Sequence, residues 1–168
     1  MRCIIAFLLA PLICFANPAP FGLAVGEMTL KEFKEKYQSQ CEGINKWSLG
    51  QMFSLSPKSI NFEGLKSVDV IFDHNEILVA VLTRLNKQKF DSVFNMLESK
   101  YKLIDKTIPF VGTKSACFSE GDVQIDLDAE HLSAEMNMNY ITKKFMHSYK
   151  NQSAEVAKRA RLVEASQL

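Results

Sequence analysis

The sequence predicts an α+β fold: an antiparallel sheet, two helices packed on one face of it, and a loosely docked C-terminal helix. Two segments with apolar residues at helical spacing each precede a series of runs that have the two-residue period of strands. Short turn-forming segments, rather than crossover helices, separate those runs, which favours antiparallel pairing. We therefore expect a single sheet whose apolar face is covered by both helices.

The first helix is predicted to begin after Thr29 and to run to about Gln38. Thr29 and Glu32 have the spacing of a capping box, in which each side chain accepts a hydrogen bond from the other residue's backbone N–H. The apolar side of this helix is formed by Leu30, Phe33 and Tyr37. The second helix is predicted over 87–100, where the residues at helical spacing are Phe90, Val93, Phe94, Leu97 and Tyr101.

Strands are predicted after each helix, and their order suggests an internal repeat. The predicted strands are 49–55, 66–72, 77–85, 101–106, 114–119, 122–127 and 131–141. A tandem αβββ unit over 28–85 and 86–141 would account for this order within one domain, 28–141. Two pairs of segments look alike, 30–37 with 94–101 and 68–73 with 123–128. The alternative is coincidence, because helix and strand periods recur in unrelated sequences.

Residues 1–16 are predicted to be a secretory signal peptide. Arg2 supplies a positive charge, and 4–15 is almost wholly apolar. That run is shorter than the roughly 20 residues of a membrane-spanning helix, and Ala16 is a small residue at the cleavage position. We expect cleavage near Ala16 and a periplasmic or secreted protein, in which 17–27 leads into the domain. The alternative is a buried N-terminal helix.

The charge of the chain argues against nucleic-acid binding. The sequence has 20 basic and 19 acidic residues, and the predicted cleavage removes one basic residue, Arg2. Binding to nucleic acid rests on an excess of Lys and Arg, which the mature chain lacks. The segment 142–168 is nevertheless basic, with six Lys and Arg against two Glu. We expect weak contact of this tail with anionic lipid, and no membrane span.

Two cysteines, Cys41 and Cys117, remain after cleavage of the predicted signal peptide. In an oxidising compartment two cysteines have one intramolecular pairing, and a Cys41–Cys117 disulfide would tie the two halves of the chain together. Closing so long a loop is worth about 4 kcal/mol in the chain-entropy description of disulfides. The alternative is two separate buried thiols.

No catalytic or metal-binding motif stands out. Asp126, Asp128 and Glu130 alternate next to His131, and oxygen ligands projecting from one side of a strand would suit Ca²⁺ or Mg²⁺. No glycine-centred loop supplies further ligands, however, and a solvated hairpin turn is the more ordinary interpretation. We predict no catalytic residues, no metal and no cofactor. An unrecognised type of enzyme is the least favoured alternative.

The last predicted strand, 131–141, has the clearest alternation in the chain. Its inner side is predicted to consist of Leu132, Ala134, Met136, Met138 and Tyr140, and its outer side of Ser133, Glu135, Asn137 and Asn139. Short polar side chains offer hydrogen bonds at low entropic cost, which suits recognition of a partner. We predict that the outer row is a binding surface; an ordinary solvated face is the alternative. Trp47 is a second candidate anchor, although such aromatic residues are more often core.

The segment Phe21-Gly22-Leu23-x-x-Gly26-x-x-Thr29-x-x-Glu32-Phe33 resembles the start of small bacterial envelope domains of the β-lactamase-inhibitor-protein and SmpA/OmlA type. The chain departs from SmpA/OmlA because no Leu-Gly-x-Pro follows the first helix and no lipidated cysteine precedes the domain. The resemblance implies a non-enzymatic binding or assembly role. The favoured hypothesis is an exported, inhibitor-like module that engages another envelope or extracellular protein. The alternative is an envelope-assembly accessory whose basic tail touches lipid.

Overall fold

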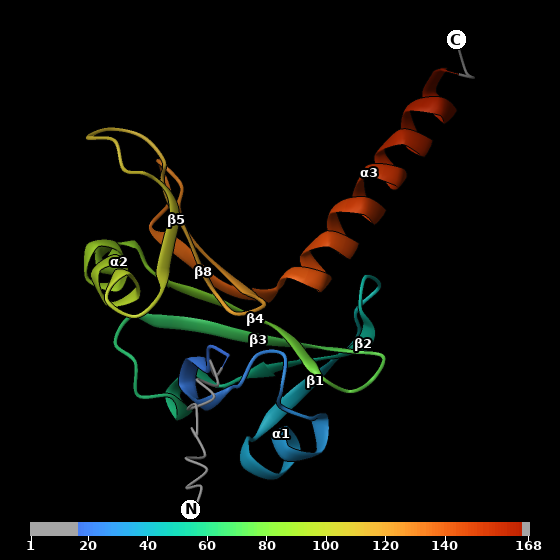
Figure 1. The fold of residues 1–168 in the computed structure, drawn as a ribbon, viewed down its shortest axis with the longest axis horizontal. Coiled ribbons are helices and arrows are strands. Elements are labelled where there is room, and N and C mark those ends of the chain that lie inside the picture. The colour runs from blue at the N-terminus through green and yellow to red at the C-terminus, as the bar shows by residue number, and fades with distance from the viewer. Residues whose placement is uncertain (1–16, 166–168) are drawn as a thin grey trace, which may run out of the picture.

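A computed structural model describes residues 17–165 and shows an α+β fold built on one eight-stranded antiparallel sheet (Figure 1). The predicted signal peptide, 1–16, lies outside the described residues. The strand order is β1-β2-β3-β4-β8-β7-β6-β5, and every neighbouring pair is antiparallel. The strands are β1 (Ser39–Ile44), β2 (Leu49–Leu55), β3 (Leu65–Asp73), β4 (Leu78–Asn86), β5 (Lys102–Thr107), β6 (Lys114–Glu120), β7 (Val123–Ala129) and β8 (Glu135–Thr142).

Each half of the sheet is a four-stranded meander preceded by a helix, and β4 pairs with β8 to join the halves. The predicted unit had three strands, and the strand missed in the first half is β1. All six residues of β1 are exposed, so this edge strand shows no alternation that a sequence pattern could reveal. The similar segments 68–73 and 123–128 fall in β3 and β7, which are the third strand of each meander.

Both short α-helices pack on the same face of the sheet, as predicted. They are α1 (Leu30–Lys36) and α2 (Phe90–Glu98), accompanied by the 3₁₀ turns η1 (Pro20–Gly22), η2 (Pro57–Ser59) and η3 (Lys87–Lys89). The capping box of α1 is confirmed, since Glu32 N–H donates to Thr29 Oγ1 at 3.3 Å and Thr29 N–H donates to a Glu32 carboxylate oxygen at 2.9 Å. Two orphan donors of a seven-residue helix are thereby satisfied.

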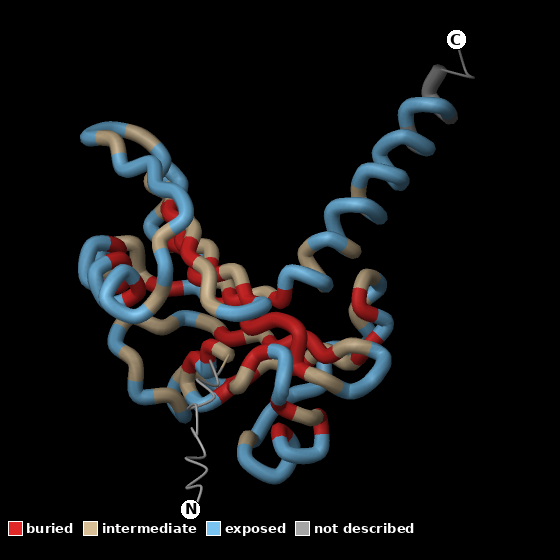
Figure 2. The backbone as a smooth tube through the Cα atoms, in the orientation of Figure 1, coloured by how far each residue is buried: buried red, intermediate tan, exposed pale blue. Residues whose placement is uncertain are grey.

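One continuous hydrophobic core lies between these helices and the sheet (Figure 2). We call this side of the sheet the inner face. The Phe33 ring of α1 lies 5.3 Å from the rings of Phe53 and Phe72, and in the second half Phe94 of α2 lies 5.6 Å from Phe118. The lead-in segment 17–27 belongs to this core, because its Leu23 and Val25 are fully buried.

Strand β8 is shorter than predicted. It begins at Glu135, and the preceding residues form a turn in which Leu132 is 93% exposed and Ala134 is also exposed. The assignment of these two residues to the inner side was therefore wrong. An apolar residue continued the alternation by chance, while Lys87 Nζ donates to the carbonyls of Glu130 and His131 and holds the segment as a turn. The inner row that follows is confirmed, with Met136, Met138 and Tyr140 all buried.

The C-terminal segment forms one long helix, α3 (Lys143–Ala165), which projects away from the sheet (Figure 1). Thr142 caps it, because its Oγ1 accepts a hydrogen bond from the Phe145 N–H at 3.3 Å. Phe145 packs against a small apolar cluster on the sheet, and most of the helix beyond Tyr149 is exposed. Among the helices of residues 17–165, none is both long and apolar enough to cross a membrane.

The predicted Cys41–Cys117 disulfide is corrected by the structure, in which both residues are free thiols. Cys41 lies on the edge strand β1, whereas Cys117 lies on β6. Six strand spacings separate β1 from β6 in the sheet order, and at ~4.8 Å per spacing this places the two residues roughly 25–30 Å apart. A disulfide requires Cα atoms within about 7 Å, so this fold excludes the intramolecular bond.

Candidate binding surface

The face of the sheet opposite α1 and α2, here called the outer face, is covered within residues 17–165 only by the first turns of α3 (Figure 1). Strand β8 lies at its centre. Asn137 is flanked by Arg84 of β4 and Asp128 of β7, and Asn139 by Leu82 and Asp126. The outer face is therefore a polar surface several strands wide rather than a single row.

The four residues predicted as a binding row do not all lie on that strand. Glu135, Asn137 and Asn139 do, and Glu135 lies 3.5 Å from Lys66 Nζ in an ion pair. Asn137 is exposed, whereas Asn139 is half-buried and its Oδ1 accepts a hydrogen bond from Thr83 N–H at 3.4 Å. Ser133 lies in the preceding turn, where its Oγ accepts from the Glu135 N–H at 2.9 Å. Ser133 is thus a turn residue, and Asn137 is the most accessible member of the row.

The second half of the outer face is acidic. Cys117 is flanked in register by Asp105 of β5 and Asp126 of β7. Burial is the largest cause that raises the pKa of Cys117, to about 11, and the negative charges of Asp126, Asp105 and Asp128 add to it. The pKa of Asp128 is raised as well, by burial and then by Asp126. Cys117 is therefore a neutral thiol at physiological pH, which argues against a nucleophilic role, because the thiolate is the reactive form.

At the other end of the outer face, an apolar groove of about 310 Å³ lies between the β1–β2 turn and the start of α3. We call it the aromatic groove. The Trp47 ring contacts Tyr149 edge to face at 5.4 Å, and Lys46 Nζ lies 4.4 Å from the centre of the Trp47 ring. The groove is lined by Asn45, Trp47, Ile71, Leu82, Ile141, Phe145, Met146 and Tyr149.

The β1–β2 turn is held in a constrained conformation. The Asn45 side-chain oxygen accepts the N–H groups of Trp47 and Ser48 at 2.9 and 3.0 Å, and Leu49 has a φ of +60°, which is uncommon for a bulky residue. Gly50 follows, where a Cβ atom would lie 2.1 Å from the Phe72 carbonyl oxygen. These constraints fix Trp47 beside the groove and leave Leu49 68% exposed.

Exposed apolar side chains lie beyond both ends of the polar surface. Ile44 and Leu49 flank the β1–β2 turn, and each is about two-thirds exposed. The loop 108–113 between β5 and β6 presents Phe110, which is fully exposed, and Val111. In Figure 1 this loop and α3 both rise away from α1. Apolar groups around a polar centre provide contact area for a macromolecule.

The geometry offers recognition chemistry and no catalytic constellation that we can identify in the described residues. No group of three or more His, Cys, Asp and Glu side chains in that part of the chain is placed to hold a metal ion. Asp126 and Asp128 lie on the outer face of β7, whereas Glu130 lies past its end in the turn. The hydrogen-bonding groups of the outer face and the apolar groups at its ends are suited to binding.

Sequence reasoning missed the loop 108–113 and the aromatic groove. The loop has a signal that could have been used, because Ile108, Phe110 and Val111 form an apolar run between two predicted strands, where turns are usually polar. The groove has no comparable signal in the sequence, because its side chains come from four separate segments of the chain. Trp47 was a candidate anchor, and the structure places it half-buried at the edge of that groove.

Comparison with known proteins yields no match to any family model, to any curated protein or to any solved structure. The resemblance to β-lactamase-inhibitor-protein-like and SmpA/OmlA-like domains therefore stays a prediction.

Proposed function

We propose that the protein is an exported, non-enzymatic binding module that engages another envelope or extracellular protein through the outer face of its sheet. The observation that carries the proposal is the fully exposed Phe110, which lies beyond one end of the polar outer face, with Ile44 and Leu49 beyond the other. Interfaces commonly combine a few large apolar anchors with surrounding polar groups.

The electrostatics of the outer face indicate the chemistry of the partner. Asp105 of β5 and Asp126 and Asp128 of β7 lie on the two strands that flank β6, and no ion pair to any of them occurs within residues 17–165. Burial raises the pKa of Asp128, so the ionised carboxylate is held there at a cost. Asp126 accepts hydrogen bonds from Gln124 Nε2 at 2.8 and 3.0 Å, so a partner that brings Lys, Arg or backbone N–H groups to this region would pair chiefly with Asp105 and Asp128.

A retention experiment with matched variants tests the proposal. The tagged protein is incubated with an envelope extract, and bound proteins are quantified. Phe110→Asp changes an exposed side chain in the loop 108–113, and Asn137→Arg changes one in the polar row of β8. Both variants should fold normally and should retain a stoichiometric partner at least tenfold less well than the wild type. Glu35→Arg changes an exposed residue of α1, away from the outer face, and should bind as the wild type does. Normal binding by both folded outer-face variants would contradict the proposal.

The proposal includes export, which rests on the sequence of residues 1–16. An intact-mass measurement of the envelope fraction should show a chain that begins at or near Asn17. A species that still begins at Met1 would contradict export by signal cleavage.

A second candidate, a structural accessory in contact with anionic lipid, is favoured by one observation. Helix α3 projects from the body, and its residues 143–161 include six basic residues and a single acidic residue, Glu155. Retention on vesicles that contain anionic lipid, lost in high salt and lost on truncation after Ser148, would support this role. Equal retention on neutral vesicles would contradict it.

A further inference from the structure

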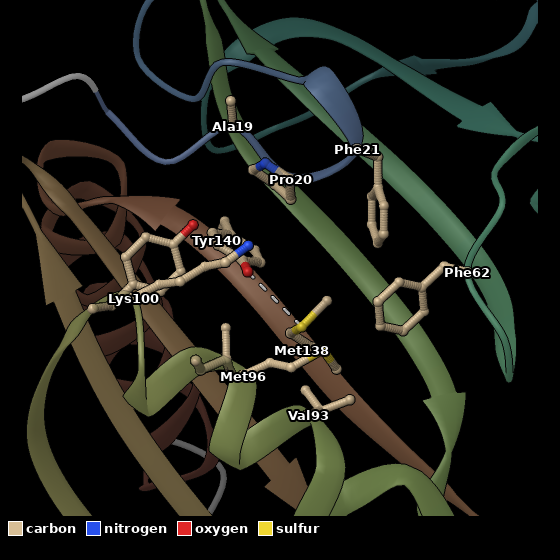
Figure 3. Close-up of a pocket in the computed structure, with 11 residues that line it drawn as sticks. Ala19, Pro20, Phe21, Phe62, Val93, Met96, Lys100, Met138 and Tyr140 are labelled. Carbon is tan, nitrogen blue, oxygen red and sulfur yellow. Dashed lines mark hydrogen bonds between the residues drawn. The ribbon is translucent and has the colours of Figure 1, made fainter.

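A pocket of about 240 Å³ lies on the inner side of the sheet, between the two halves of the molecule (Figure 3). We call it the seam pocket. Phe21 and Phe62 form its wall in the first half, α2 forms the wall in the second half, and Met138 and Tyr140 of β8 line it between them. Ligand pockets usually measure about 300–1,000 Å³, so this one suits a molecule no larger than a single ring with a short chain.

The hydroxyl of Tyr140 is the buried polar group of the pocket. Tyr140 is 4% exposed, and the hydrogen bond that its hydroxyl donates is a long one, 4.0 Å to Met138 Sδ. A thioether sulfur is a weak acceptor, so the donor is poorly satisfied. Burial, and then the neighbouring Tyr101, raises the pKa of this hydroxyl, which therefore stays protonated at neutral pH. Its other partner is the neutral hydroxyl of Tyr101, which also lines the pocket, so among the described residues this O–H donor has no charged acceptor.

Lys100 adds a positive charge at the same place. Its side chain is exposed, and no carboxylate of the described residues pairs with it. Figure 3 shows this side chain extending across the pocket toward Tyr140. A cation and a neutral O–H donor among apolar walls match a carboxylate attached to an apolar body.

The first-half wall is held in position before any ligand arrives. Phe21 has a φ of +55°, a left-handed conformation that is rare for a bulky residue. The Tyr37 hydroxyl donates to the Phe21 carbonyl at 3.0 Å, and the Phe21 ring packs edge to face on Phe62 at 5.5 Å. Backbone strain maintained by surrounding contacts is typical of binding sites, and a preformed wall lowers the entropic cost of binding.

We propose that the seam pocket binds a small organic carboxylate with an apolar body, of the aryl- or alkylacetate class. Tyr140 donates to one carboxylate oxygen, Lys100 pairs with the carboxylate, and Phe21 and Phe62 contact the apolar body. The seam pocket lies on the inner side of the sheet, so this proposal does not depend on the partner surface of the outer face.

Titration of the exported protein with phenylacetate, followed by NMR of the Met138 and Val93 methyl groups, tests the proposal. We expect a Kd of about 1 mM or tighter, and binding at least tenfold weaker for 2-phenylethanol, which has the same ring and no charge. Tyr140→Phe and Lys100→Met should each weaken phenylacetate binding about tenfold, because each removes one partner of the carboxylate. Lys102→Met is the control, since it removes an exposed cation two residues away on β5.

Any of three outcomes would overturn the proposal. The first is the absence of a methyl shift at about 20 mM phenylacetate, which is well above the expected Kd. The others are equally strong binding of 2-phenylethanol and unchanged phenylacetate binding by both pocket variants. Lys100→Met changes an exposed residue, so it decides the matter even if Tyr140→Phe perturbs the fold.

Discussion

The two faces of the sheet differ in burial and in side-chain polarity, although the same strands form both. On the inner face, side chains such as Phe72 and Phe118 are fully buried beneath α1, α2 and the lead-in segment. On the outer face, the same strands present Asp, Asn and Ser, with a small apolar cluster where α3 begins. The inner face therefore accounts for most of the stability, and the polar outer face contributes less to it.

The largest effect is expected from Phe118→Ala, which tests whether stability resides in the inner face. Phe118 is fully buried against Phe94, and its removal leaves a cavity in the core. We expect a loss of about 3–5 kcal/mol in the free energy of unfolding, measured by urea denaturation. Its neighbour Ser119 points to the other face, where its hydroxyl donates to the Val123 carbonyl at 3.3 Å, and Ser119→Ala should cost no more than ~1 kcal/mol. Equal losses would abolish the distinction between the faces.

Alkylation of the two thiols tests the electrostatics of the outer face. Cys41 is exposed, whereas Cys117 is half-buried beside Asp105 and Asp126, with a pKa of about 11. Only about 0.1% of such a thiol is ionised at pH 8, so iodoacetamide should modify Cys41 and leave Cys117 largely intact. Modification of Cys117 should accelerate about tenfold per pH unit up to pH ~11, and Asp126→Asn should accelerate it at pH 8. Peptide mapping measures the extent of labelling at each cysteine. Labelling of Cys117 at a rate independent of pH would contradict a raised pKa for this thiol.

The smallest effect is expected from Asp128→Asn. Burial raises the pKa of Asp128, so the folded protein binds the proton of this side chain more tightly than the unfolded chain does. The resulting gain in the free energy of unfolding is complete below the unfolded-state pKa and is lost as pH rises through the folded-state pKa. The wild type therefore carries a small penalty above pH ~4. The uncharged variant should match or exceed the wild type by up to ~0.5 kcal/mol at pH 7. Because the side chain is only partly buried, solvent screening keeps the effect small. A clear loss of stability at pH 7 would show that the charge supports the fold.

Sequence patterns predicted the fold well where one face of an element is buried. The capping box placed the start of α1, and two apolar, β-branched runs on either side of a turn placed β3 and β4. Strand β1 was missed because its six residues are exposed on both sides, and alternation arises only when one side is buried. The start of β8 was misplaced because Leu132, an exposed turn residue, continued the pattern of the strand.

The candidate surface was only partly predictable. Glu135, Asn137 and Asn139 were expected on the outer face of the last strand, and they lie there. Their neighbours Asp126 and Arg84 are brought beside them by the pairing of β8 with β7 and β4, and pairing partners cannot be derived from periodicity alone. The same limit applies to the seam pocket, which unites η1, α2 and β8.

The pairing of β4 with β8 has a consequence for how the chain reaches its fold. Strand β4 is complete at Asn86, but its partner begins only at Glu135. At synthesis rates of about 5–20 residues per second, the intervening segment takes roughly 2–10 s to make. Throughout that time the first meander would have an unpaired, apolar strand edge, which is a template for aggregation or for exchange with another copy. Delaying folding until the whole chain is available removes this hazard.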